Sequence, residues 1–455
     1  MSDDLRLRDR IQRDMGRVQA ELERLVRIPS VSSDSADPGP LRDCAEVTAS
    51  LLEEAGAADV RLLEVDGAPP AVLAECDGSS GAPTVLLYAH YDVQPPGDAK
   101  TWASPPYEPV ARGGRLYGRG TADDKAGIAL HAAVARAFDG RPPVRVRILI
   151  EGEEEIGSPH LDRFLERYAS ELASDVIVLA DNPNWRLGVP SITTSLRGLI
   201  DCVVEVRVLD HAVHSGEFGG PVVDAIASLA RLLATLHDDT GSPAVEGLSY
   251  GAIRGPELDE AEFRSLAGVR PGVQLAGAGP LTERLWSRPA ISVLGIDAPT
   301  IAEAANQIVP AARALVSVRL APDDDPAAAM EALRAHLQEH APWGGEVRIT
   351  AGRQMMGPGA VLDTRGAHYD VARSALADAW GERPVAIGGG GSIPIVTAFS
   401  QAFPHASLLL TGVADPGSRL HAENESVDLG ELERGSVAEA LLLSRLAAVA
   451  PSAPT

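Results

Sequence analysis

Short, continuously apolar runs alternate along this chain with segments of helical spacing. The runs cover residues 84–89, 144–150 and 175–179, and the helical segments 122–138 and 159–173 lie between them. Strands without polar alternation are typical of parallel sheets that helices bury on both faces. The pattern therefore predicts an α/β fold in which a central β-sheet is flanked by helices.

A different pattern of apolar and polar residues interrupts this alternation in the middle of the chain. Residues 200–208 and 315–320 alternate between apolar and polar side chains, which indicates strands with one exposed face. A chain of 455 residues is long enough for two or three domains. We therefore expect residues 191–351 to form an α+β domain inserted into a main domain made of residues 1–190 and 352–455.

The acidic balance of the chain limits its partners. The formal net charge is -24, and only Lys100 and Lys125 supply lysine, whereas phosphate binding needs clusters of Lys and Arg. Every apolar stretch is far shorter than the ~18 residues of a membrane span. The N-terminal residues are acidic and lack the apolar core of a signal peptide. We expect a cytoplasmic protein that binds neither nucleic acid nor membranes.

The pattern of cysteines does not indicate a disulfide or metal-binding role. Cys44, Cys76 and Cys202 are odd in number and far apart in the sequence. Such a set forms neither a disulfide framework nor a zinc knuckle. We expect all three thiols to lie in the core.

Potential metal ligands follow each apolar run of the main domain. They are His90 and Asp92 after the first run, Asp123 and Asp124 in a later loop, Glu151, Glu153, Glu154 and Glu155 after the second run, Asp181 after the third, and His421 after the apolar run 406–410. Ligands of open α/β sheets bind beyond the carboxyl ends of the strands, so these groups are expected to converge.

Each of these groups also has an ordinary structural explanation. A single histidine after a strand is usually structural, an Asp-Asp pair often caps a helix, and a glutamate run can begin a solvated helix. Imidazoles and carboxylates at five successive strand ends fit a pair of divalent cations better than they fit a set of independent helix caps. Three carboxylates and one hydroxide would balance two dications, whereas the carboxylates alone would repel one another.

The chain resembles the M20 metallopeptidases, and within them the carnosinase-like cytosolic dipeptidases. The resemblance covers nearly the whole sequence. The matching motifs, in family order, are His90-Tyr91-Asp92-Val93-Gln94-Pro95, Trp102 with Pro105-Pro106-Tyr107-Glu108-Pro109, Leu116-Tyr117-Gly118-Arg119-Gly120 with Asp123-Asp124-Lys125, and Glu154-Glu155-Ile156-Gly157-Ser158. The resemblance implies that the main domain is catalytic and that the insertion is a lid used for dimerisation.

The resemblance also implies a role for each member of the cluster. His90 would bind one metal ion and His421 the other, with Asp123 bridging them. Glu155 and Asp181 would complete the two sites. Asp92 would orient the His90 imidazole. Glu154 would be the general base that takes a proton from a metal-bridging water and delivers it to the leaving amine.

Three further positions match the family outside the metal cluster. His214, in His214-Ser215-Gly216-Glu217-Phe218-Gly219-Gly220, would stabilise the oxyanion in the partner subunit, and Arg319 would bind the substrate carboxylate. Ser392 belongs to a glycine-rich substrate loop that begins at Gly388. An Arg-Glu pair commonly stands in carnosinases where this chain has Gly388-Gly389, which puts the recognition of a free substrate amine in question.

The expected function is therefore a homodimeric hydrolase with two divalent ions per subunit, zinc above manganese or cobalt. It would cleave the amide bond of dipeptides or small peptides with a free carboxylate. An N-acyl or N-succinyl amino acid deacylase is the main alternative, because the same centre attacks any amide. An inactive metal-binding scaffold and a two-metal phosphohydrolase remain as further alternatives, the latter requiring added positive charge at the site.

Overall fold

The computed structural model describes residues 3–33, 36–79, 81–251, 253, 255–352, 356–391 and 393–449. The chain divides into two compact units. Unit 1 comprises Met1–Thr194, Leu362–Ile387 and Ile393–Thr455, and unit 2 comprises Ser195–Val361 and Gly388–Ser392. Residues 356–361 belong to unit 2 although the sequence predicts them in the main domain, and the same holds for the stretch Gly388–Ser392. This stretch groups with unit 2 because Gly388 lies against Trp286 and Gly390 against Arg197.

Unit 1 is built on a mixed sheet whose centre is parallel. The strand order is β1-β2-β6-β3-β7-β17-β8, and β16 also pairs with β8. The bounds are β1 (Asp59–Leu63), β2 (Ala71–Cys76), β3 (Thr84–His90), β6 (Arg145–Glu151), β7 (Val176–Leu179), β8 (Ser191–Leu196), β16 (Val385–Gly389) and β17 (Ser407–Leu410). Strands β6, β3, β7 and β17 run parallel to one another, so their carboxyl ends share one edge of the sheet.

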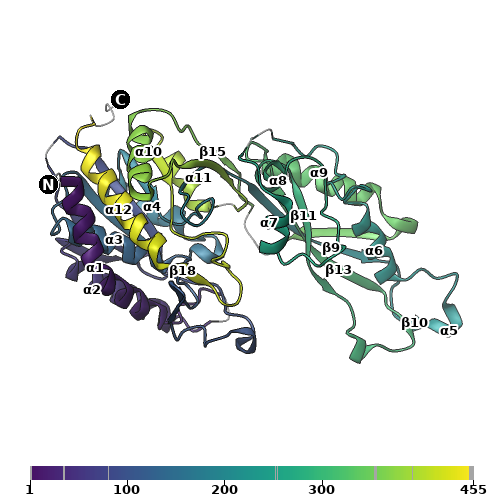
Figure 1. Cartoon of the computed structure of the whole chain (residues 1–455). Helices are drawn as coiled ribbons and strands as arrows, with labels where there is room; N and C mark the ends of the chain where they lie inside the picture. The colour runs from purple at the N-terminus through teal and green to yellow at the C-terminus, as the bar shows by residue number, and fades with distance from the viewer. Residues whose placement is uncertain are drawn as a thin grey trace. The chain divides into compact units, whose positions relative to one another are not determined.

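Helices cover both faces of this sheet (Figure 1). One layer consists of α1 (Asp3–Val26), α2 (Gly39–Glu54), α3 (Lys125–Ala137), α10 (Ala367–Trp380) and α12 (Leu429–Leu446). In β3 the buried side chains of Val85 and Leu87 join the core of this layer. The neighbouring Tyr88 faces the other side, where its ring meets Phe399 of α11 (Pro394–Ala402) edge-on. Helix α4 (Leu161–Leu172) contacts α11 on that side.

A small sheet joins two distant parts of unit 1. Its order is β18-β5-β4, with β4 (Val110–Arg112), β5 (Arg115–Tyr117) and β18 (Ser426–Asp428). Strand β18 begins five residues after His421 and β5 ends six residues before Asp123, with Ser426 opposite Tyr117. The pairing therefore brings the C-terminal segment beside the loop that precedes α3.

Unit 2 contains an antiparallel sheet of order β11-β13-β9-β14 covered by two helices. The bounds are β9 (Gly198–Arg207), α6 (Ala225–Ala234), β11 (Ala290–Asp297), β13 (Ala311–Leu320), α9 (Pro326–Glu339) and β14 (Glu346–Ala351). Strands β13 and β14 both run antiparallel to β9, which lies between them. The β13-α9-β14 connection is therefore a βαβ crossover split by one strand, which agrees with the predicted α+β character.

The remaining elements of unit 2 are short. They are β10 (Val213–His214), α5 (Ser215–Phe218), α7 (Glu260–Leu266), α8 (Leu281–Trp286), β12 (Gln307–Ile308) and β15 (Ala360–Val361). Helix α7 forms because the Asp259 side chain accepts a hydrogen bond from the Glu262 amide and caps its first turn.

Two composition-based expectations can be compared with the described residues. None of the described helices combines the length and apolarity needed to cross a bilayer. Cys44, Cys76 and Cys202 are buried and none is in a disulfide, as the sequence predicted.

Candidate metal centre

His90 and Asp92 sit at the carboxyl end of β3. The His90 side chain is fully buried, and its Nδ1 lies 3.0 Å from the Asp92 carbonyl oxygen and 3.2 Å from Asp92 Oδ1. The same carboxylate accepts the backbone N–H groups of Glu154, at 3.2 Å, and Glu155, at 3.0 Å. Asp92 thus joins the imidazole on β3 to the segment after β6, and it leaves His90 Nε2 free to face the other ligands.

Asp123 lies between two histidines that are far apart in the sequence. Asp123 occupies the loop before α3, a helix that begins at Lys125. The peptide bond between Asp123 and Asp124 is cis. Asp123 Oδ1 is 3.0 Å from His90 Nε2, and Asp123 Oδ2 is 3.0 Å from His421 Nε2. A carboxylate with one oxygen toward each imidazole has the arrangement of a bridging ligand.

Glu155 and Asp181 complete two overlapping groups. Glu155 Oε2 is 3.1 Å from His421 Nε2, and Asp181 Oδ1 is 3.8 Å from His90 Nε2. The potential ligand atoms of His90, Asp123 and Asp181 lie within 4.8 Å of one another, as do those of Asp123, Glu155 and His421. The five predicted ligands therefore meet at the shared edge of β3, β6 and β7.

The charges of this cluster fit cations. Burial raises the pKa values of Asp181 and Glu155. Hydrogen bonds to Asp123 and Glu155 raise the pKa of His421 to about 11. Burial also acts on Asp123, but hydrogen bonds from His421 and His90 outweigh it and lower its pKa. Positive charge from the imidazoles therefore offsets part of the repulsion among these buried carboxylates. Imidazole nitrogen and carboxylate oxygen are the donors of zinc, manganese and cobalt sites, so the residues fit a pair of such ions.

Glu154 borders the cluster without belonging to either group. It begins the short 3-10 turn Glu154–Ile156 directly after β6. Burial raises its pKa well above the ordinary range, and the nearby Asp181 and Glu155 carboxylates add to this effect. No hydrogen bond to its carboxylate is present among the described residues, so this group can take up a proton from a molecule in the site.

Two supporting residues received no role from the sequence. Gln94 donates from Nε2 to Glu155 Oε2 at 2.9 Å and from its backbone to Glu155 Oε1 at 3.2 Å. Glu425 accepts the backbone N–H of Asp123 at 3.2 Å. Each follows a predicted histidine ligand, His90 or His421, by four residues, and Gln94 also stands in the matched motif that begins at His90.

Three predicted residues do not belong to this cluster as described. His214 ends β10 in unit 2, is exposed, and its Nδ1 accepts a hydrogen bond from the Gly216 amide at 3.0 Å. Arg319 lies on β13 in unit 2 opposite Leu199 and is half-buried. Ser392 lies outside the described residues. The predicted roles of all three remain predictions.

The glycine at position 388, which departs from the carnosinase pattern, is explained by packing. A Cβ at Gly388 would come within 2.5 Å of the Cβ of Trp286 and 3.0 Å of Ser195 Oγ. Atoms at the shorter distance would overlap, so the Trp286 side chain fills the space that a side chain at position 388 would need. An arginine cannot be accommodated here without displacing Trp286.

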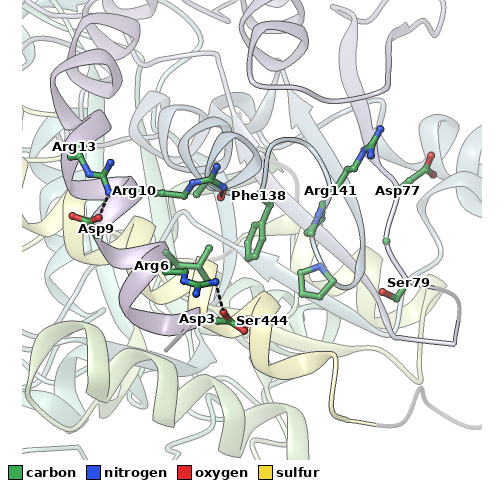
Figure 2. A pocket seen from close by; sticks show the side chains of 15 residues that line it. Asp3, Arg6, Asp9, Arg10, Arg13, Asp77, Ser79, Phe138, Arg141 and Ser444 are labelled. Atoms are coloured by element: carbon green, nitrogen blue, oxygen red, sulfur yellow. Dashed lines mark hydrogen bonds and ion pairs between the residues drawn. The ribbon is translucent and has the colours of Figure 1, made fainter. Parts of the chain in front are cut away.

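A concave region of unit 1 lies away from this cluster (Figure 2). It has a volume of about 1130 Å³ and includes residues of α1, Ser79 before β3, and Pro143 before β6. These loops lie at the amino ends of the parallel strands, at the edge opposite the ligands. Three of its four arginines are paired with aspartates: Arg6 with Asp3, Arg10 with Asp139, and Arg13 with Asp9.

The fold and the cluster together define a class: an α/β protein with a two-metal site of histidines and carboxylates and an adjacent glutamate, as in dinuclear metallohydrolases. The chain belongs to the peptidase family M20/M25/M40, whose family model matches residues 86–445. It is accordingly an enzyme of the metallopeptidase kind.

Relatives and solved structures agree with this assignment. Cysteinylglycine-S-conjugate dipeptidase of Corynebacterium striatum is 33% identical over 436 residues, which cover 94% of this chain and 95% of that protein. Beta-Ala-His dipeptidase of Homo sapiens is 30% identical over 377 residues, which cover 76% of this chain and 71% of that protein. The crystal structure of human carnosine dipeptidase 1 matches with a TM-score of 0.85 at 25% identity, covering 99% of this chain and all of that one.

Proposed function

We propose that the protein is a dinuclear metallodipeptidase that hydrolyses the amide bond of dipeptides or small peptides with a free carboxylate. The observation that carries the proposal is the pair of overlapping ligand groups that share Asp123, with Glu154 beside them. The relatives at 33% and 30% identity are named as dipeptidases, which favours dipeptides over other amides.

The metal ligands of the proposal are His90 and Asp181 for one ion, His421 and Glu155 for the other, and Asp123 for both. We propose zinc, and the same donors also accept manganese or cobalt. Two such cations, when bound, would acidify the attacking water and polarise the substrate carbonyl.

Protein groups then move the proton and hold the geometry. Glu154 accepts a proton from the attacking water and delivers it to the leaving amine. Among the described residues nothing hydrogen-bonds to its carboxylate, and its raised pKa favours transient protonation. Asp92 keeps His90 Nε2 directed toward the ligands through its contact with Nδ1. Arg319 binds the substrate carboxylate, the loop with Ser392 approaches the substrate backbone, and His214 stabilises the oxyanion.

The deacylase alternative is less well supported. The named dipeptidase relatives favour free peptides, and the glycine at position 388 is explained by its packing against Trp286. An inactive scaffold is disfavoured because every proposed ligand and the base are filled by competent residues.

The phosphohydrolase alternative is weakened because both cations of the matched motifs, Arg119 and Lys125, are already engaged. The Arg119 guanidinium forms an ion pair with Glu425 at 2.6 Å. The Lys125 ammonium is buried and donates to the carbonyl oxygens of Leu25 and Ile28, at 2.9 and 2.8 Å. Neither charge is therefore available to a transferring phosphoryl group.

We also propose that the enzyme is a homodimer that assembles through unit 2. Strand β11 is at the edge of its sheet and exposes apolar side chains, with Leu294 58% and Ile296 57% exposed. An apolar edge strand is a template for pairing with another chain. The unpaired thiols of Cys44, Cys76 and Cys202 suit a reducing cytoplasm, where we propose that the enzyme acts.

The test is product formation, followed by mass spectrometry, after zinc or manganese is added to the metal-stripped full-length protein. Free dipeptides, N-acyl amino acids and N-succinyl amino acids are offered side by side. We expect metal-dependent cleavage of the free dipeptides. Cleavage of the blocked substrates alone would assign the protein to the deacylases, and cleavage of none would overturn both proposals.

A further inference from the structure

We propose that Glu425, with Arg119 as its counter-ion, is a positioning residue that fixes the loop carrying Asp123 and the segment carrying His421 in one geometry. The inference rests on the proposed metal centre and deepens it. Glu425 supplies no ligand atom to either group of candidate ligands. It acts on metal binding through the backbone of the residues that do.

The Glu425 carboxylate is a fourfold acceptor. Its Oε2 accepts Arg119 Nη1 at 2.6 Å and the Gly120 amide at 3.0 Å. Its Oε1 accepts the amides of Ala122 at 2.9 Å and Asp123 at 3.2 Å. Amides at positions 120, 122 and 123 thus converge on one side chain, which defines the path of the loop up to the candidate bridging ligand.

The backbone of Glu425 adds a fifth contact. Its carbonyl oxygen accepts the Gly118 amide at 3.0 Å. The pairing of β18 with β5 continues this contact from Ser426 onward. Glu425 is therefore the point at which the C-terminal segment and the loop of residues 118–123 are joined.

His421 depends on such an anchor because its segment is exposed and irregular. Its side chain is 57% exposed, whereas that of His90 is fully buried. Arg419, His421 and Asn424 all have positive φ angles, so the chain between them makes tight turns without regular structure. Asn424 Oδ1 accepts the Ala103 amide at 2.7 Å, and the next residue is Glu425.

The positive charge of Arg119 stabilises the buried Glu425 carboxylate. The two side chains are only 2% and 0% exposed, so neither charge could be kept there without the other. The Arg119 guanidinium also donates to the Pro95 carbonyl oxygen at 3.4 Å and lies 5.5 Å from the Trp102 ring centre. This ion pair, together with the backbone amides that Glu425 accepts, limits the movement of Asp123 relative to His421.

The test measures zinc binding to the metal-stripped full-length protein by titration calorimetry, together with the zinc concentration for half-maximal dipeptide cleavage. In Glu425→Gln one carboxylate oxygen is replaced by an NH₂ group, which cannot accept hydrogen bonds. Either the pair from Arg119 and Gly120 or the pair from Ala122 and Asp123 is then lost. We expect the zinc Kd of at least one site, and the half-activating concentration, to rise about 10- to 100-fold. Saturating zinc should restore most of kcat, because the ligands and Glu154 are unchanged.

A second variant guards against misfolding, because Glu425→Gln leaves the Arg119 charge buried and unpaired. Arg119→Gln combined with Glu425→Gln removes both charges and should show the same loss of zinc affinity. The matched control is Glu21→Gln, because Glu21 also pairs with an arginine, Arg136, at 2.6 Å but contacts no ligand loop. It should bind zinc as the parent does.

The outcomes separate this inference from the proposed function. A folded double variant that binds two zinc ions with the parent's Kd values would overturn the positioning role, whatever the parent cleaves. Equal weakening in Glu21→Gln would overturn it as well, because the effect would then reflect general destabilisation. A parent protein that binds zinc but cleaves no dipeptide would overturn the proposed function and leave the positioning role standing.

Discussion

Glu154 and Glu155 are adjacent in the sequence but differ in what surrounds their carboxylates. Glu155 is held by Gln94 and faces His421, which fixes both oxygens in place. Glu154 shares the same turn, yet its carboxylate has no hydrogen bond among the residues that the structure covers. A fixed carboxylate suits a ligand, whereas a free one suits proton transfer.

Replacing Glu154 tests this division of roles. Glu154→Gln keeps the shape of the side chain but removes the proton acceptor, so kcat should fall about 10²- to 10⁴-fold with metal content unchanged. Metal content is measured by elemental analysis and kcat by dipeptide cleavage. Glu153→Gln is the control, because Glu153 bonds to His160 and should leave most of kcat intact. Turnover at the parent's rate in Glu154→Gln would remove Glu154 from the mechanism.

Burial controls the chemistry of the cysteines as well. Burial raises the pKa of the Cys76 thiol to about 11. At pH 8 roughly one Cys76 side chain in a thousand is then a thiolate, the reactive form. Because the pKa of Cys76 is higher in the folded than in the unfolded protein, the neutral thiol favours the folded state. This contribution to the free energy of unfolding is complete below the unfolded pKa of about 8.5 and is lost as the pH rises toward 11.

A thiol-reactive dye provides the measurement. In the native protein at pH 8 we expect the thiols of Cys44, Cys76 and Cys202 to react at least a hundredfold more slowly than in urea, because all three are buried. Native thiols that react as fast as unfolded ones would show that the cores around them open readily.

At the residue scale, the convergence of the five candidate ligands was predictable because His90, Glu155 and Asp181 lie at or just after the ends of apolar strands of the same parallel sheet. The supporting residues were not. Gln94 acts partly, and Glu425 largely, through backbone amides, and the residue type at a position does not reveal which amides will surround it. The packing of Trp286 against Gly388 was equally hidden, because it joins positions about a hundred residues apart.

Helix α1 shows what one element contributes to unit 1. It contacts α3 and α12, and the stripe that includes Ile11, Val18 and Leu22 is buried in the core. Leu22→Ala removes buried methyl groups and leaves a cavity, so the free energy of unfolding should fall by about 2 to 5 kcal/mol.

Urea denaturation with the far-ultraviolet circular dichroism signal measures this change. Leu187→Ala is the control, because Leu187 is exposed and its truncation should change the unfolding free energy by at most about 0.5 kcal/mol. A loss of the same size in both variants would mean that α1 does not pack as described.

Periodicity decided which elements could be predicted. The long amphipathic helices and the apolar strands β3, β6 and β7 were predicted close to their observed bounds. Strand β2 was missed because Ala71–Cys76 has no distinctive alternation and two small alanines. Strand β11 was missed because its exposed apolar residues do not alternate, and the bulge between Val293 and Gly295 breaks the pattern further.

At the scale of the whole molecule, the proposed dimer makes a prediction about shared active sites. Glu154→Ala and His214→Ala subunits should each be inactive alone. If His214 acts in the partner subunit, mixing the two should restore up to about a quarter of the parent's activity. The mixture is assayed for dipeptide cleavage after exchange of subunits, with heterodimers verified by differently tagged chains. Heterodimers without restored activity would mean that each subunit uses its own His214.

The order in which the ligands leave the ribosome follows from the position of His421 in the chain. His90, Asp123, Glu155 and Asp181 are synthesised first, and His421 follows Asp181 by 240 residues. At ~5 to 20 residues per second, about 12 to 48 seconds pass before the last ligand is made. Strand β17, which lies between β7 and β8, arrives in the same late segment. A nascent chain therefore carries an incomplete set of candidate ligands until the segment with β17 and His421 has emerged, and the candidate metal site can form only after that point.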